Sequence, residues 1–202
     1  MKFSITATDE LIAALRRRDF KTAIRIADAY RKNKFEAPVH PGAAAMTIKP
    51  APRSIKEREA DLARVFTLRP KILNGLKPEQ WEGVYLNYAV WQLLGRVATE
   101  KCMPGFIGIG TMDPVTVTRM LSFYVRSQRD LACWRELGIK RGTIIGIGGC
   151  EACLALKNKT YSLDRLPELP YADCTCARGC RCSARAVLQF SEEAPDSVEG
   201  LP

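Results

Sequence analysis

Six of the eight cysteines in this 202-residue chain lie within 33 consecutive positions, between Cys150 and Cys182. Asp9 and Glu10 stand near the amino terminus, where a secretory signal peptide would carry its apolar stretch, so we expect an intracellular protein whose thiols are kept reduced. Cysteines gathered in such a compartment are typical metal ligands. The sequence therefore predicts a zinc site rather than a disulfide framework.

The spacing of the cysteines is typical of a zinc module. Cys150 and Cys153 are separated by two residues, and at this spacing one tight turn presents both sulfurs to the same ion. A second group follows about 20 residues later and contains Cys174, Cys176, Cys180 and Cys182. Six thiols compete for four tetrahedral positions, and the spacing does not decide which of the second group bind.

Hydrophobic periodicity predicts helices through most of the preceding chain. Two short helices are expected within residues 9–32, beginning after Thr8 or Asp9 and after Asp19, and further helices over 54–67, 78–101 and 114–137. The β-branched run from Thr143 to Ile147 predicts a strand that leads into the cysteines. The expected fold class is α+β, with mostly helical amino-terminal and middle regions followed by a small β-rich zinc module.

These elements suggest five segments. They are a basic helical hairpin (1–35), a Pro/Ala-rich linker (36–53), a helical domain (54–138), the cysteine-rich zinc module (139–190) and a loose acidic tail (191–202). Cys102 and Cys133 are expected to be buried thiols, since free cysteine is among the most buried residue types. The glycines of residues 105–110 follow a helix and lack the order of a dinucleotide-binding fingerprint, so a loop is expected there.

Positive charge is concentrated in the first part of the chain. Of the net charge of +9, residues 1–75 carry +8, with 16 Lys and Arg against 8 Asp and Glu. Such a surface attracts phosphate backbones or acidic proteins, and equally serves as a solvated face. Arg16, Arg17 and Arg18 stand together between the first two helices and are the candidate residues for binding a nucleic acid or a partner.

The carboxyl-terminal part resembles a known family. The resemblance is carried by Trp134-Arg135-Glu136-Leu137-Gly138, by Cys150-Glu151-Ala152-Cys153, by Lys159-Thr160-Tyr161-Ser162-Leu163-Asp164, by Leu166-Pro167-Glu168-Leu169-Pro170 and by Cys180-Arg181-Cys182. This pattern is similar to the end of phage Mu F-like minor head proteins, over residues 119–190 at most. The resemblance implies a zinc-stabilised module and a role in head assembly.

The resemblance also ranks the ligands. Members of the family often place His-Pro before the final Cys-Arg-Cys, and Cys174 falls where the histidine is expected. With Cys180 opening the Cys-Arg-Cys element, the predicted ligands are Cys150, Cys153, Cys174 and Cys180, with Cys176 and Cys182 as substitutes.

The sequence favours a non-enzymatic protein. His40, the one histidine, lies in the proline-rich stretch without nearby carboxylates, and a thiolate-rich site favours a closed structural metal centre. We therefore expect a zinc-stabilised structural or assembly protein of phage or prophage origin, located in the cytoplasm of a bacterial host or in the virion. Its expected partners are other phage structural proteins or a second copy of itself, and no membrane. The alternative is a nucleic-acid-binding regulator that contacts DNA through its basic amino-terminal helices.

Overall fold

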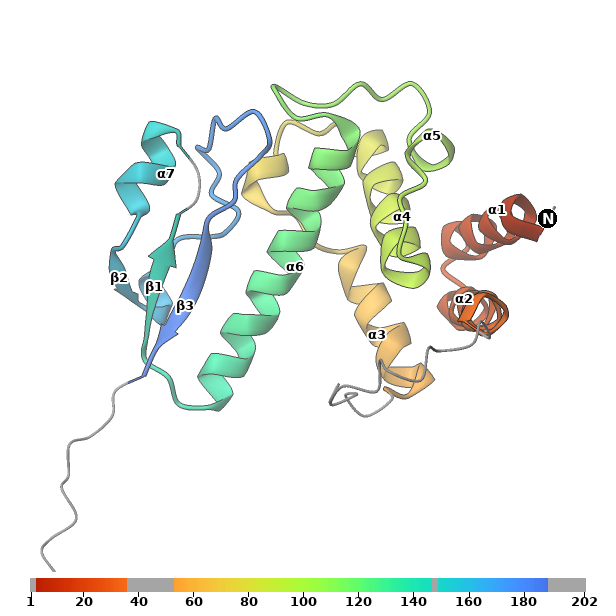
Figure 1. The fold of residues 1–202 in the computed structure, drawn as a ribbon, viewed down its shortest axis with the longest axis horizontal. Coiled ribbons are helices and arrows are strands. Elements are labelled where there is room, and N and C mark those ends of the chain that lie inside the picture. Colours follow the sequence, from red (N-terminus) through yellow and green to blue (C-terminus); the bar gives the residue numbers. More distant parts are fainter. Residues whose placement is uncertain (1–2, 36–52, 147–148, 189–202) are drawn as a thin grey trace, which may run out of the picture.

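The computed structural model describes residues 3–35, 53–146 and 149–188, and it shows an α+β fold (Figure 1). In these ranges the α-helices are α1 (Phe3–Arg16), α2 (Phe20–Phe35), α3 (Ile55–Val65), α4 (Pro78–Leu94), α5 (Thr99–Cys102), α6 (Pro114–Glu136) and α7 (Glu151–Leu156). The strands are β1 (Arg141–Ile145), β2 (Thr160–Ser162) and β3 (Ser183–Val187), and short 3-10 turns cover Lys71–Leu73 and Leu163–Arg165.

The expected hairpin is present as α1 and α2. The Asp19 carboxylate accepts a hydrogen bond from the Thr22 backbone N–H at 3.1 Å and thereby caps α2. Leu11, Leu15 and Ile24 are completely buried, because the apolar faces of the two helices pack against each other and against α4. α1 begins earlier than predicted, at Phe3.

The prediction of a single helix over residues 78–101 is wrong in one respect, because the helix breaks at Gly95. α4 ends at Leu94, and Gly95 takes a left-handed conformation (φ +70°) whose N–H donates to the Trp91 carbonyl at 2.8 Å. Glycine adopts this conformation without the strain that a Cβ would cause. The chain then resumes as the separate short helix α5.

α6 lies between the carboxyl-terminal sheet with α7 on one side and the helices α1 to α5 on the other (Figure 1). The Asp113 side chain accepts from the Thr116 N–H at 2.6 Å and fixes the predicted start of this helix, and Gly138 follows its end with φ +71°. β1 is the central strand of an antiparallel sheet with the order β2-β1-β3. The ring of Trp134 lies 3.4 Å from the Cβ position of Gly142, so the sheet approaches α6 closely at this point.

The buried residues form one cluster that extends from Leu11 in α1 to Cys182 beside β3. The helical hairpin, the middle helices and the cysteine-rich segment therefore share a continuous core in the described part of the chain. Cys102 is buried as predicted, whereas the prediction for Cys133 is wrong, since this thiol is exposed on α6. The predicted linker (except Arg53) and the predicted tail lie outside the described residues.

The glycine-rich segment of residues 105–110 forms the expected loop. Ile109 and Met112 exchange two backbone hydrogen bonds of 3.0 and 2.9 Å, and Gly108 has φ +123°.

Within the described residues, none of the helices is long and apolar enough to cross a membrane.

Candidate metal centre

Cys150 and Cys153 are positioned by the first turn of α7. Cys150 is the N-cap of this helix, with extended backbone (φ −77°, ψ 155°), and Cys153 is its third residue. An N-cap side chain and the side chain three positions later lie over the same helical turn, so both sulfurs face one point. Cys153 is completely buried and Cys150 is partly exposed.

Cys174 and Cys176 lie in the loop that precedes β3. The Cys174 N–H donates to the Tyr171 carbonyl at 3.2 Å, and the Cys176 N–H donates to the Cys174 sulfur at 3.5 Å. A further turn is closed by the Gly179 N–H, which donates to the Cys176 carbonyl at 2.8 Å. These turns aim both thiols of the loop toward the first turn of α7.

Four of the cysteines, Cys150, Cys153, Cys174 and Cys176, have all their sulfur atoms within 4.8 Å of one another. The sulfur of Cys174 is 3.8 Å from that of Cys150 and 3.4 Å from that of Cys153. Zinc–sulfur bonds of about 2.3 Å in a tetrahedron place the ligand sulfurs about 3.8 Å apart. The residues present therefore fit a tetrahedral, all-thiolate metal ion.

A second group consists of Cys153, Cys180 and Cys182, whose sulfurs also lie within 4.8 Å of one another. All three are buried, and the Tyr171 N–H donates to the Cys180 sulfur at 3.2 Å. Cys153 belongs to both groups. A metal ion in the second group alone would have three thiolates and would need a further ligand.

The structure thus brings all six predicted cysteines together, in an arrangement that differs from the predicted ranking. Cys150, Cys153 and Cys174, predicted as ligands, share the four-sulfur group with Cys176, which was predicted as a substitute. Cys180, the predicted fourth ligand, belongs instead to the group with Cys153 and Cys182. Spacing cannot distinguish these alternatives, because the turns between Tyr171 and Gly179 decide which sulfurs point toward Cys150.

Electrostatics distinguish the thiols from one another. Burial raises the pKa of Cys174 to about 12 and that of Cys182 to about 11, and it raises the pKa of Cys153 as well. Burial also acts on Cys150, but the backbone N–H groups of Cys153 and Thr175 favour its thiolate and lower its pKa to about 6. A cluster with one acidic thiol and several thiols that resist ionisation requires a cation before all its ligands are thiolates.

The segment between β2 and β3, which carries Cys174 to Cys182, is anchored to the helices at two points. Gly179 approaches α6 so closely that a Cβ there would lie 2.7 Å from the Met120 side chain. Glu168, in the proline-flanked segment, accepts a hydrogen bond from the Lys71 backbone N–H at 2.6 Å. The cysteine module is therefore attached to the helices by packing and by a polar contact.

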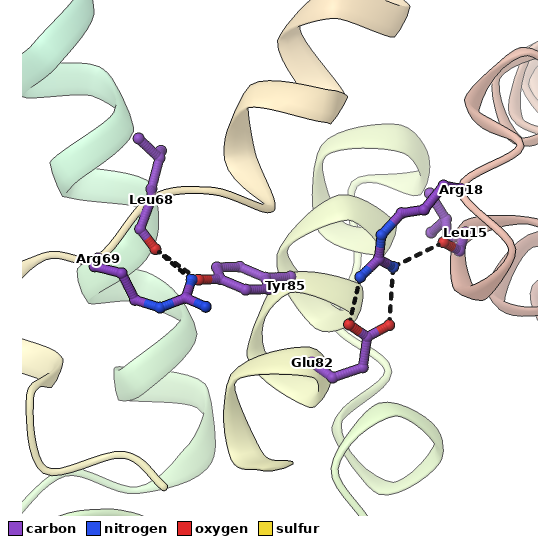
Figure 2. Close-up of polar contacts among 6 residues, drawn as sticks. All are labelled: Leu15, Arg18, Leu68, Arg69, Glu82 and Tyr85. Atoms are coloured by element: carbon purple, nitrogen blue, oxygen red, sulfur yellow. Dashed lines mark hydrogen bonds and ion pairs between the residues drawn. The ribbon is translucent and has the colours of Figure 1, made fainter. Parts of the chain in front are cut away.

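The three candidate arginines at the end of α1 differ in what they contact. Arg18 forms two hydrogen bonds with the Glu82 carboxylate, of 2.9 and 2.6 Å, and donates to the Leu15 carbonyl (Figure 2). Its guanidinium also lies 4.0 Å from the centre of the Phe66 ring. Arg16 and Arg17 are exposed. Arg18 therefore joins α1 to α4, and only the other two present open cationic groups.

The same close-up shows a second contact around α4. The Tyr85 hydroxyl donates to the Leu68 carbonyl at 2.6 Å, and the Arg69 guanidinium lies 5.1 Å from the centre of the Tyr85 ring (Figure 2). These contacts hold the segment after α3 against α4.

Sequence reasoning missed a second cluster of functional groups, in which arginines from α2, α3 and α6 line one pocket. The surplus of positive charge in residues 1–75 was the only signal of it, and that signal did not include Arg129 of α6.

No protein-family model, curated protein or solved structure matches this chain.

Proposed function

We propose that residues 139–190 form a zinc-stabilised, non-catalytic module through which the chain takes part in phage head assembly by protein–protein contacts. The observation that carries the zinc part is the four-sulfur group of Cys150, Cys153, Cys174 and Cys176. The assembly role is supported by the resemblance of residues 119–190 to the end of Mu F-like minor head proteins.

The donor set favours a structural role for the metal. Four thiolates complete a tetrahedron, whereas a catalytic zinc keeps one position for water or substrate. Metal binding at such a site contributes directly to folding, because the ligands join the loop before β3 to the first turn of α7. With the metal bound, the sheet β2-β1-β3, α6 and the cysteine loop would form one rigid unit.

Geometry supports Cys176 as the fourth ligand, and the Cys-Arg-Cys element supports Cys180. The two alternatives share Cys150, Cys153 and Cys174. In the first, Cys180 and Cys182 are buried thiols of the core, consistent with their complete or nearly complete burial.

The decisive experiment measures metal content after purification under reducing, chelator-free conditions. We expect close to one zinc ion per chain by mass spectrometry of the metal. A metal-free protein that is folded over residues 139–190 would contradict the zinc proposal.

Single Cys→Ser variants identify the ligands. Cys150→Ser, Cys153→Ser and Cys174→Ser are expected to lose zinc and to become sensitive to protease within residues 140–190, since loss of a ligand is loss of folding energy. Cys133→Ser is the matched control, because this thiol is exposed and far from the cluster in sequence. Loss of zinc in Cys176→Ser with retention in Cys180→Ser would establish the geometric alternative, and the reverse result would establish the predicted ranking.

The assembly role needs a separate test. We expect the protein to be detected by mass spectrometry in gradient-purified phage particles, or in their head precursors, produced by the host strain. Its presence only in the particle-free lysate would contradict the role in head assembly and leave the zinc proposal intact.

A further inference from the structure

A pocket of about 270 Å³ opens between α2, α3, α4 and α6, away from the cysteines. Five arginines line it and define what we call the arginine pocket: Arg31, Arg53, Arg58, Arg64 and Arg129. Asp61 is the one carboxylate among its lining residues. Arginines from three helices and from the segment just before α3 therefore line one concave site.

Two of the five arginines are neutralised by carboxylates. Arg58 forms a bidentate pair with Asp28, with distances of 2.8 and 2.9 Å, and Arg53 contacts Asp61 at 2.5 Å. The first pair joins α3 to α2, and the second joins α3 to the residues just before it. They leave the other three arginines as the source of excess charge.

The remaining arginines have no carboxylate partner in the described part of the chain. Arg31 donates to the Gln92 carbonyl at 3.1 Å, a contact that leaves its charge uncompensated. Arg64 and Arg129 are exposed, and their guanidinium groups make no ion pair with the described residues. An anion that entered the pocket would meet three available charges, in the forked geometry that suits phosphate.

Tyr88 supplies a hydrogen-bond donor to the arginine pocket. Its side chain lines the pocket and is only 4% exposed, and its hydroxyl makes no hydrogen bond to any described residue. Burial raises the pKa of Tyr88 to about 12, and the charges of Arg129 and Asp61 act on the same hydroxyl. Among the described residues no buried side-chain nitrogen or oxygen lacks a hydrogen-bond partner, so this hydroxyl is in contact with solvent in the pocket, where it is a protonated donor at neutral pH that a ligand can reach.

Part of the pocket lining is apolar. Leu62, Val65 and Leu93 are buried and line it, and Gln92 and Gln128 belong to the same lining. A volume of about 270 Å³ is close to the lower limit of about 300 Å³ for sites of small organic molecules, and it is far larger than a phosphate ion needs. The site thus combines apolar surface, amide groups and unpaired guanidinium groups.

We propose that the arginine pocket binds a nucleotide, with the phosphate at Arg64 and Arg129 and the base over the apolar surface near Tyr88. Stacking and apolar contact bind the flat face of a base, and amides offer the donor and acceptor pair that a base edge requires. The nucleotide has two sources with the same chemistry, a free mononucleotide or one residue of a single strand. The proposal is independent of the zinc module.

The test uses the full chain in titrations with adenosine monophosphate, inorganic phosphate and a fluorescein-labelled single-stranded oligodeoxyadenosine. We expect the mononucleotide, the strand or both to bind, more tightly than inorganic phosphate. Arg64→Glu/Arg129→Glu should weaken binding at least about tenfold, since hydrogen bonds to charged groups are lost. Tyr88→Phe, which removes only an unpartnered hydroxyl and retains the fold, should weaken it about threefold or more.

The matched control is Lys56→Glu/Arg135→Glu, which makes the same change of charge on the same two helices outside the pocket. It should retain binding within about twofold, since only screened, long-range attraction changes. Binding of the mononucleotide identifies the free nucleotide as the source, and binding of the strand alone identifies a nucleic acid. Absence of binding to both, equal loss in the control, or phosphate binding as tight as nucleotide binding would each overturn the proposal.

Discussion

The sulfur atoms of Cys153 and Cys174 lie 3.4 Å apart, although 21 positions separate them in the chain. One belongs to the first turn of α7 and the other to the loop before β3, so the strand β2 and the proline-flanked segment lie between them in sequence. Cys153 also belongs to the second sulfur group, with Cys180 and Cys182. This residue is therefore the point at which both halves of the cysteine cluster meet.

Zinc binding should release protons. Without the metal the module is expected to unfold, and thiols of an unfolded chain have a pKa of about 8.5, so they are mostly protonated at neutral pH and must ionise when they bind zinc. We expect between about two and four protons released per zinc ion, measured by calorimetric titration of the apoprotein in buffers of different ionisation enthalpy. A titration enthalpy that does not depend on the buffer would contradict thiolate ligation.

Removal of the Asp113 cap should lower stability in a pH-dependent manner. The Thr116 backbone N–H lowers the pKa of Asp113 below its ordinary value of 3.8, so its carboxylate stabilises the folded state above that value and loses this effect as pH falls through the folded pKa. Asp113→Ala should cost about 1 kcal/mol of unfolding free energy at pH 7 and less near pH 3. Urea unfolding at both pH values measures this difference.

Asp113→Asn is the matched variant for this prediction. An asparagine retains the capping oxygen but does not titrate, so it should remain within a few tenths of a kcal/mol of the parent at pH 7. A loss of stability in Asp113→Ala that is equal at pH 3 and pH 7 would exclude the carboxylate as the source.

The Arg18–Glu82 pair should contribute modestly to stability. Their side chains are 43% and 41% exposed, so solvent screens the ion pair despite its two hydrogen bonds. A double-mutant cycle of Arg18→Ala and Glu82→Ala should give a coupling energy of about 0.5 to 1 kcal/mol in thermal or urea unfolding. Arg17→Ala with Glu82→Ala provides the comparison and should give a coupling near zero. Equal coupling in both cycles would show that the coupling comes from general charge–charge attraction and not from the Arg18–Glu82 ion pair.

Asn87 should be among the most sensitive polar positions. It is completely buried in α4, accepts from the Ala98 N–H at 2.7 Å and donates to the Thr118 hydroxyl at 2.9 Å, so it connects α4 with α6 and with the break before α5. Asn87→Ala leaves the Ala98 N–H without its partner and should cost about 2 to 3 kcal/mol. The exposed Asn74→Ala should cost less than about 0.5 kcal/mol. Urea unfolding of both variants is the measurement, and similar losses would contradict the assigned role.

Helix boundaries with local signals were predictable from the sequence. Asp113, Pro114 and Gly138 delimit α6, and Asp19 and Ser54 precede α2 and α3, because a capping carboxylate or hydroxyl acts within one turn of its own position. The break of α4 at Gly95 was missed. A glycine in a helical pattern ends the helix only when the following residues find other partners, and here the buried Asn87 supplies one to Ala98.

The sequence by itself determined that six thiols gather near one site, since the number and the spacing of the cysteines are local properties of the chain. Only the tertiary structure decided that Cys176 belongs to the sulfur group of Cys150 and Cys180 to that of Cys182, because the turns after Tyr171 and the packing of Gly179 on Met120 fix the course of this loop. The arginine pocket likewise arises from tertiary packing alone. Arg64 and Arg129 are 65 positions apart and become neighbours of one cavity only because α3 and α6 both border it.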